Sequence, residues 1–189
     1  MKSKTLLPLL AFVVLAAALY FLTLEKERCR RTVTSYRVPH VTLLNQDGKP
    51  VALQRYLNSD KPLLLEFIFT SCTSLCPNQA VKFSNFQKKL TPNNQQVQLV
   101  SISVDPETDT PAVLRHYLRH YHALPGWDFL TGSMSAIRQV MQAFDIKPSD
   151  MITLDSSLLL RSPKTGRWIR VDGQLDGQDF MREYQLLEK

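Results

Sequence analysis

Two hydrophobic patterns alternate along most of this chain. Continuous apolar runs at residues 63–69 and 97–104 are typical of buried strands. Between and after them, apolar residues recur at helical spacing with polar residues on the other side. This spacing predicts helices over residues 77–90, 111–120 and 132–144, and a last helix ending near Leu187. Strands that alternate with helices in this way predict an α/β fold around a central sheet.

Turn residues add two β-hairpins to this layout. Residues 38–44 and 51–53 read as strands joined by the turn Asn45-Gln46-Asp47-Gly48, in which Asn, Asp and Gly tolerate left-handed backbone geometry. Residues 158–161 and 167–171 are predicted to pair around Pro163-Lys164-Thr165-Gly166. Shorter strands are predicted at residues 127–130 and 151–154. The last residues of the chain then form the terminal helix.

The N-terminal segment has a different pattern. Residues 5–24 carry no charged side chain, and at helical rise they span about 30 Å, the thickness of a membrane hydrocarbon core. We therefore predict a cytoplasmic N-terminus at residues 1–4, a transmembrane anchor at 5–24, a linker at 25–36 and one domain at 37–189, outside the cytoplasm. A cleaved signal peptide is the alternative, although the apolar run exceeds a usual signal core.

Composition and charge narrow the class of protein. The chain has 189 residues and a formal net charge of +6. The Lys and Arg residues are scattered, without the basic helix or basic–aromatic stripe that would indicate a nucleic-acid partner. Three cysteines are too few for a disulfide scaffold. Their spacing indicates one functional pair, Cys72 and Cys76, and one separate thiol, Cys29, which we interpret as an exposed juxtamembrane residue.

The candidate chemistry lies at Cys72 and Cys76, where a buried strand is followed by a helix opened by Pro77. Unpaired amides and the helix dipole at such a position favour a thiolate. Thiols four residues apart can form a redox-active disulfide, or bind a soft ion such as Cu(I), or Zn(II) with further ligands. A zinc finger is excluded because no second ligand pair follows. The alternative of two inert core cysteines is weakened by the polar residues around them.

The motif F-x-F-T-x-C-x-x-x-C-P at residues 67–77 resembles the signature of the Sco/SenC family. Three further segments are similar to that family: residues 101–111, which contain S-V-D-P and D-T-P, residues 127–132, which read W-x-x-L-T-G, and residues 43–51. The resemblance runs through residues 37–180 in order.

This resemblance implies a thioredoxin-like fold, here with an N-terminal β-hairpin and a β-hairpin insertion, preceded by one transmembrane helix. It also implies copper as the bound metal, with Cys72 and Cys76 as ligands and as a redox-active pair. The implied partner is the copper-bearing subunit of a cytochrome c oxidase or its assembly factors. The implied location is a cell inner membrane, with the domain in the periplasm or an equivalent space.

One departure from the family pattern concerns the third copper ligand, a histidine in a D-H-S/T step before an apolar strand. Ser156 stands at that place here, and a hydroxyl is a poor copper ligand. We predict that no other histidine comes within bonding reach of both sulfurs; the four are His40, His116, His120 and His122. The thioethers of three methionines are interpreted as core filler; they are Met134, Met141 and Met151.

Three functions stay open from the sequence. The first is a Sco-like copper chaperone, and the second is a copper-independent thiol–disulfide oxidoreductase for extracytoplasmic proteins. The third, a thiol peroxidase, rests on fold analogy alone. All three use the same two thiols, and we expect Cys72 to attack because Cys76, at the helix junction, should be covered.

Overall fold

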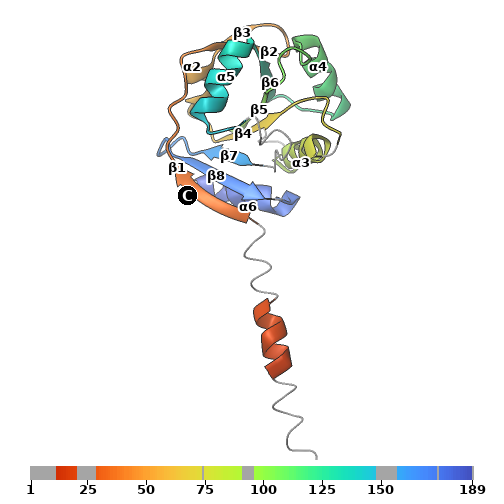
Figure 1. Ribbon diagram of the computed structural model, residues 1–189, viewed down its shortest axis with the longest axis vertical. Helices are drawn as coiled ribbons and strands as arrows, with labels where there is room; N and C mark the ends of the chain where they lie inside the picture. The colour runs from red at the N-terminus through yellow and green to blue at the C-terminus, as the bar shows by residue number, and fades with distance from the viewer. Residues whose placement is uncertain are drawn as a thin grey trace, which may run out of the picture.

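An eight-stranded mixed sheet runs through the protein (Figure 1). The computed structural model describes residues 12–20, 29–73, 75–90, 96–147, 157–173 and 175–188. The strand order is β1-β8-β7-β4-β5-β6-β2-β3. The strands are β1 (Cys29–Thr34), β2 (Thr42–Asn45), β3 (Pro50–Ala52), β4 (Leu63–Ile68), β5 (Gln98–Ser103), β6 (Trp127–Thr131), β7 (Leu158–Arg161) and β8 (Trp168–Gly173).

The central strands are parallel and the outer ones antiparallel. β5 pairs in parallel with β4 and with β6, whereas β7 pairs antiparallel with both β4 and β8. The helices are α2 (Leu53–Leu57), α3 (Leu75–Leu90), α4 (Pro111–His120), α5 (Met134–Ala143) and α6 (Gly177–Glu188). The series β4-α3-β5, followed by the hairpin β7–β8 and helix α6, confirms the predicted α/β, thioredoxin-like order.

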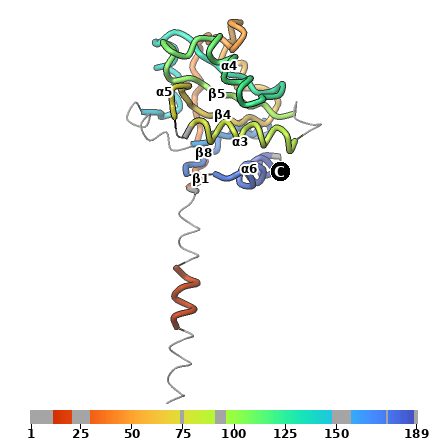
Figure 2. Tube along the Cα trace, turned by 90° about the vertical axis from the view of Figure 1, so that its right-hand side faces the viewer, coloured from red at the N-terminus to blue at the C-terminus, as the bar shows by residue number. Residues whose placement is uncertain are grey.

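The helices cover the two faces of the sheet and form two cores. On one face, α2 and α5 bury Leu57 and Val140 against Leu65 and Phe67 of β4. On the other face lie α3, α4 and α6, and both views show α3 beside α6 (Figures 1 and 2). Phe83 of α3 packs edge-on against Phe180 of α6, with ring centroids 5.5 Å apart. The strands between these layers are therefore buried on both sides, which explains their continuous apolar runs.

Local capping fixes the ends of two helices where the sequence predicted them. The Thr110 hydroxyl accepts a hydrogen bond from the Val113 amide at 3.4 Å, and Pro111 is the first helical residue of α4. The Ser133 hydroxyl likewise accepts a hydrogen bond from the Ala136 amide of α5 at 3.2 Å. Each cap satisfies an amide that has no partner within the helix.

The predicted N-terminal hairpin is confirmed as β2–β3. The Asn45 side chain accepts hydrogen bonds from the Asp47 and Lys49 amides at 3.0 and 2.9 Å, and Gly48 has φ +73°. Leu43 of β2 then packs against Gly132 so closely that a Cβ on the glycine would lie 2.8 Å from the Leu43 side chain. A larger residue at position 132 would push the buried Leu43 side chain out of place, so the close approach favours glycine there.

Strand β1 corrects the prediction of a linker over residues 25–36. Residues Cys29–Thr34 form a six-residue strand that pairs antiparallel with β8 at the edge of the sheet. The sequence predicted a connector because the segment is polar. In the structure Val33, the one large apolar residue of β1, is 62% exposed. The strand is instead held by its backbone ladder and by an ion pair between Arg31 and Glu183 at 3.3 Å.

Of the predicted anchor at residues 5–24, the structure describes residues 12–20, which are helical. Among the described residues, no helix has both the length and the apolar character needed to cross a membrane. The transmembrane anchor therefore stays a prediction.

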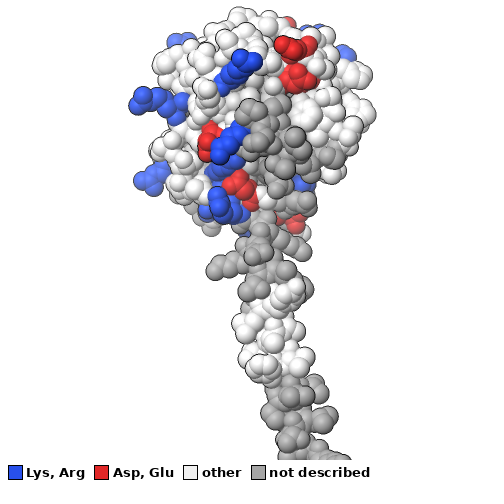
Figure 3. Space-filling model, in the orientation of Figure 1, with Lys and Arg blue, Asp and Glu red and all other residues white. Residues whose placement is uncertain are grey.

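Charged side chains are interspersed on the face of the protein seen in Figure 3. Basic and acidic groups lie next to one another there. Arg170 and Asp172 of β8 form an ion pair at 2.7 Å, for example.

Candidate functional site

The two predicted site residues, Cys72 and Cys76, lie at the carboxyl end of β4. All six residues of this strand are buried. The chain then turns tightly, with the Cys72 amide donating to the Phe69 carbonyl at 3.2 Å, and enters helix α3 at Leu75. Cys72 is therefore in the turn before the helix, and Cys76 is in its first turn.

The start of α3 corrects one prediction. Pro77 was expected to be the first helical residue, but the helix begins two residues earlier. A proline is tolerated there because the amides of the first helical turn have no carbonyl partner within the helix. Cys76 is consequently a helical residue rather than the last residue of the loop.

The two thiols converge on one point. The Cys76 amide donates to Cys72 Sγ at 3.4 Å, and the Cys76 thiol lies within hydrogen-bonding reach of the Cys72 thiol. Both cysteines are free thiols. An amide at a helix N-terminus that points at a sulfur stabilises negative charge on it. The arrangement thus favours Cys72 as the thiolate of the pair.

The pair is asymmetric in exposure. Cys76 is buried, with 4% of its surface exposed, whereas Cys72 is partly exposed. Burial raises the pKa of Cys76 to about 12, and the neighbouring Cys72 and Glu66 add to the rise. The expectation that Cys76 is the covered thiol is confirmed.

A buried carboxyl group, Glu66, lies on β4 beneath the pair. Its Oε1 accepts a hydrogen bond from Ser101 Oγ at 2.6 Å, and Trp127 Nε1 donates to the same Ser101 hydroxyl at 3.0 Å. Its Oε2 is buried without a hydrogen-bond partner. Burial raises the pKa of Glu66 to about 8, against the opposing effects of Ser101 and Lys82. Sequence reasoning missed this residue, although one acidic side chain within an apolar strand was the available signal.

A second buried carboxylate, Asp109, connects the cysteine-bearing turn to the loop after β5. Asp109 has no exposed surface. It accepts hydrogen bonds from the Thr70 amide at 3.1 Å, from the Thr70 hydroxyl, and from the Ser103 hydroxyl at 2.5 Å. These contacts hold the ends of β4 and β5 together just before Cys72. The sequence showed Asp109 within a motif, but a contact across 39 positions left no local signal.

We expect Asp109→Ala to lower the free energy of unfolding by about 2–4 kcal/mol, because the substitution leaves the partly buried amide and hydroxyl of Thr70 and the buried Ser103 hydroxyl without their acceptor. Urea unfolding of the reduced protein measures the change. Glu107→Ala, an exposed acid in the same loop, is the matched control and should change stability by less than about 0.5 kcal/mol. Equal effects of the two substitutions would contradict this role for Asp109.

The histidines do not join the pair. His40, His116, His120 and His122 are all described and all exposed. Over the described ranges, no group of three or more His, Cys, Asp or Glu side chains lies close enough to hold a metal ion. The prediction that none of these four histidines reaches both sulfurs is confirmed.

The remaining candidate ligands are a serine and three methionines. Ser156 and Met151 lie outside the described residues. Met141 is buried in the core between α5 and the sheet, as predicted for core filler, and Met134 is partly buried at the start of α5. Among the residues that the structure describes, the donor set brought together is therefore the two sulfurs alone. Two thiolates suit a soft, low-coordinate ion such as Cu(I), and the same pair suits disulfide exchange.

Comparisons with known proteins agree with this layout. A family model described as SCO1/SenC matches residues 31–158. The SCO1 protein homolog of Bacillus subtilis is 37% identical over 137 residues, which cover 68% of this chain and 70% of the relative. The structure of BsSco, described as a member of the Sco family of cytochrome c oxidase assembly proteins with a disulfide switch, is 31% identical. Its TM-score is 0.64, over 82% of this chain and 95% of BsSco.

A copper-bound structure is also similar. Arabidopsis thaliana ScoI with copper bound has a TM-score of 0.61 and 26% identity, over 78% of this chain and 93% of ScoI.

Proposed function

This chain belongs to the SCO1/SenC family, and we propose that it assists the assembly of the copper centre of a cytochrome c oxidase through Cys72 and Cys76. The observation that carries the proposal is the convergence of the two free thiols at the start of α3. Copper is the cargo in this proposal, held as Cu(I) by the two thiolates until a partner takes it. The copper-bound state of Arabidopsis ScoI supports copper as that cargo.

The partner proposed is the copper-bearing subunit of the oxidase or one of its assembly factors. BsSco, of similar structure, is described as an oxidase assembly protein. We further propose that residues 5–24 anchor the chain in the inner membrane, with the domain in the periplasm or an equivalent space. Support for the anchor comes from the absence of charged residues in this segment. An oxidising compartment would also give the free thiol pair a redox role.

A second function, thiol–disulfide exchange without copper, is favoured by the missing third ligand. Two sulfurs converge, but no nitrogen donor joins them among the residues that the structure describes. In this reaction the Cys72 thiolate attacks a partner disulfide, forms a mixed disulfide and releases one partner thiolate. The Cys76 thiolate then attacks the Cys72 sulfur and releases the second partner thiolate, so that two electrons pass to the partner. The disulfide switch described for BsSco supports this alternative.

Copper titration of the reduced full chain tests the first function. We expect one Cu(I) per chain for the wild type, and none for the Cys72→Ser/Cys76→Ser double variant under the same competing chelator. Cu(II) should bind at least about tenfold more weakly than Cu(I), because Cu(II) is less soft than Cu(I) and favours a nitrogen donor beside the thiolates.

The control variant is Cys29→Ser, which removes the third thiol and should leave Cu(I) binding unchanged. Retention of Cu(I) by the double variant would place the copper site elsewhere and overturn the proposal. Loss of Cu(I) by the wild type to a modest chelator, together with rapid reduction of a peptide disulfide, would select the second function instead.

A further inference from the structure

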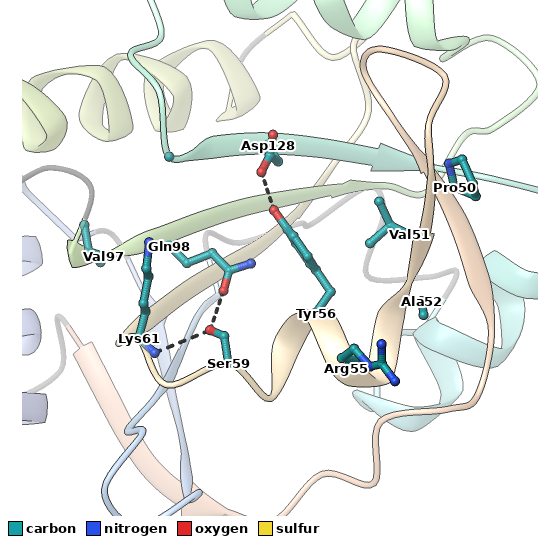
Figure 4. Close-up of a pocket in the computed structure, with 11 residues that line it drawn as sticks. Pro50, Val51, Ala52, Arg55, Tyr56, Ser59, Lys61, Val97, Gln98 and Asp128 are labelled. Carbon is teal, nitrogen blue, oxygen red and sulfur yellow. Dashed lines mark hydrogen bonds between the residues drawn. The ribbon is translucent and has the colours of Figure 1, made fainter.

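A cavity of about 630 Å³ opens at the end of the sheet opposite the cysteines (Figure 4). It is walled by β3, α2, the loop before β4, and the amino ends of β5 and β6. Since the cysteines follow the carboxyl end of the six-residue strand β4, about 20 Å of strand separates them from this cavity. The cavity is therefore a separate feature from the thiol site.

The polar side chains in the back wall of the cavity are hydrogen-bonded to other side chains of the protein. The Tyr56 hydroxyl donates to one carboxylate oxygen of Asp128, and Gln46 Nε2 donates to the other at 2.8 Å. The Ser59 hydroxyl donates to Gln98 Oε1 at 2.7 Å. Burial and the adjacent Asp128 raise the pKa of Tyr56 well above its usual range, so this phenol stays a neutral donor. Each oxygen of Asp128 therefore already accepts one hydrogen bond from a neutral donor.

Two cationic side chains flank this wall, Arg55 on one side of Tyr56 and Lys61 on the other (Figure 4). Both are exposed, and within the part of the chain that the structure describes neither has a carboxylate at ion-pair distance. Arg161 lies behind them, where its Nη1 donates to the Ser59 carbonyl at 3.1 Å and Asp60 is close enough to offset its charge. The charged groups that line the cavity are therefore two cations and one carboxylate, Asp128.

The rest of the lining is apolar. Pro50, Val51 and Ala52 form one side, and Val97 lies across from them beyond Tyr56 (Figure 4). The volume falls within the range of about 300–1,000 Å³ that small-molecule sites occupy. Such a site combines an apolar surface with a small number of polar groups that orient the ligand.

We propose that this cavity binds a small organic anion, with its apolar body against Val51 and Val97 and its negative charge attracted by Arg55 and Lys61. A cation is disfavoured because two cationic side chains and one carboxylate, Asp128, line the cavity. A purely apolar ligand would leave these two exposed cations without a counter-charge. The site is independent of the copper and disulfide chemistry proposed for the cysteines.

Binding of 2-naphthoate to the full chain, followed by isothermal titration calorimetry, tests this proposal. A bicyclic carboxylate of this size should bind with a dissociation constant of about 1 mM or lower. The neutral 2-naphthamide should bind at least about threefold more weakly, and added salt should weaken only the carboxylate. The Arg55→Gln/Lys61→Gln double variant, altered only at exposed side chains, should lose at least about fivefold in affinity for 2-naphthoate.

Two control variants test whether 2-naphthoate binds in this cavity. Arg115→Gln removes an equally exposed cation that is paired with Asp47 and does not line the cavity, and it should bind 2-naphthoate as the wild type does. The Cys72→Ser/Cys76→Ser variant should also bind normally, which keeps the outcome separate from that of the copper experiment. Equal affinity for the carboxylate and the amide, equal affinity of the double variant and the wild type, or no binding of 2-naphthoate would each overturn the proposal.

Discussion

Iodoacetamide should alkylate Cys72 of the folded, reduced protein at least about 100-fold faster than Cys76. The thiolate is the species that reacts, and burial raises the pKa of Cys76 to about 12. At pH 8 a thiol with that pKa is ionised to about one part in 10⁴, against about a quarter for a thiol at the usual 8.5. The 4% exposure of Cys76 slows its reaction further.

Single cysteine variants in a Cys29→Ser background allow the alkylation rates of Cys72 and Cys76 to be measured separately. Cys76→Ser leaves only the Cys72 thiol, and Cys72→Ser leaves only the Cys76 thiol, so mass spectrometry reports one rate for each chain. The Cys76 rate should rise about tenfold per pH unit between pH 8 and 10, because those values lie below its pKa. In denaturant the two rates should become equal. Equal rates in the folded protein would contradict the asymmetry and the assignment of Cys72 as the attacking thiol.

This asymmetry is a part of the site that the sequence could predict. The apolar run 63–69 had to be a buried strand, and the polar residues after it had to lie at its end. A helix start next to Cys76 covers that sulfur with its own first turn and leaves Cys72 in the preceding loop. The local hydrophobic pattern and the turn residues were sufficient to predict which cysteine is covered, as they were to predict the Thr110 cap of α4.

The sequence failed to predict features of the structure that are stabilised by contacts between distant parts of the chain. Strand β1 has no apolar periodicity, and its structure depends on β8, which lies more than 130 positions later in the sequence. The contact of Asp109 with Thr70 depends on β4 and β5 lying next to each other, and no short motif encodes that neighbourhood. Contacts between distant segments determine both features, so local structural propensity alone could not predict them.

The lack of a third ligand among the described residues is the difference that separates the two proposed functions. Within the described residues, the thiol pair has two sulfurs and no nitrogen donor, while the exposed histidines of α4 lie apart from it. A two-sulfur site holds Cu(I) but offers little to Cu(II). We therefore expect any copper bound by this chain to be released on oxidation, when the thiols become a disulfide and lose their donor character.

Glu66→Gln should abolish a large pH dependence of stability between about pH 4.5 and 8. Burial raises the pKa of this carboxyl group from its ordinary 4.5 to about 8, because the charged form has no water and one oxygen has no hydrogen-bond partner. In that window the folded protein keeps a proton that the unfolded chain has lost. Stability is therefore full below pH 4.5 and falls as the pH rises to 8, by a total on the order of 4 kcal/mol.

Urea unfolding of the wild type and the variant at pH 5, 6, 7 and 8 measures this effect. Other titrating groups contribute equally to both proteins, so the difference between their free energies of unfolding isolates Glu66. The variant should be less stable than the wild type at pH 5, where its amide lacks an acceptor, and more stable at pH 8. Ser101→Ala is a useful second variant, because losing the hydrogen bond to Oε1 should raise the pKa of Glu66 further. Parallel stability profiles would contradict a buried, protonated Glu66.

The same substitution connects the carboxyl group to the thiol chemistry. The charge of ionised Glu66 is one of the contributions that raise the pKa of Cys76. Glu66→Gln should therefore lower the pKa of Cys76 and speed its alkylation at pH 9–10 by a few-fold. At pH 6–7 we expect no comparable change, because Glu66 of the wild type is already protonated and neutral there. An increase confined to the higher pH values would show that Glu66 acts on the resolving thiol through its charge rather than through packing.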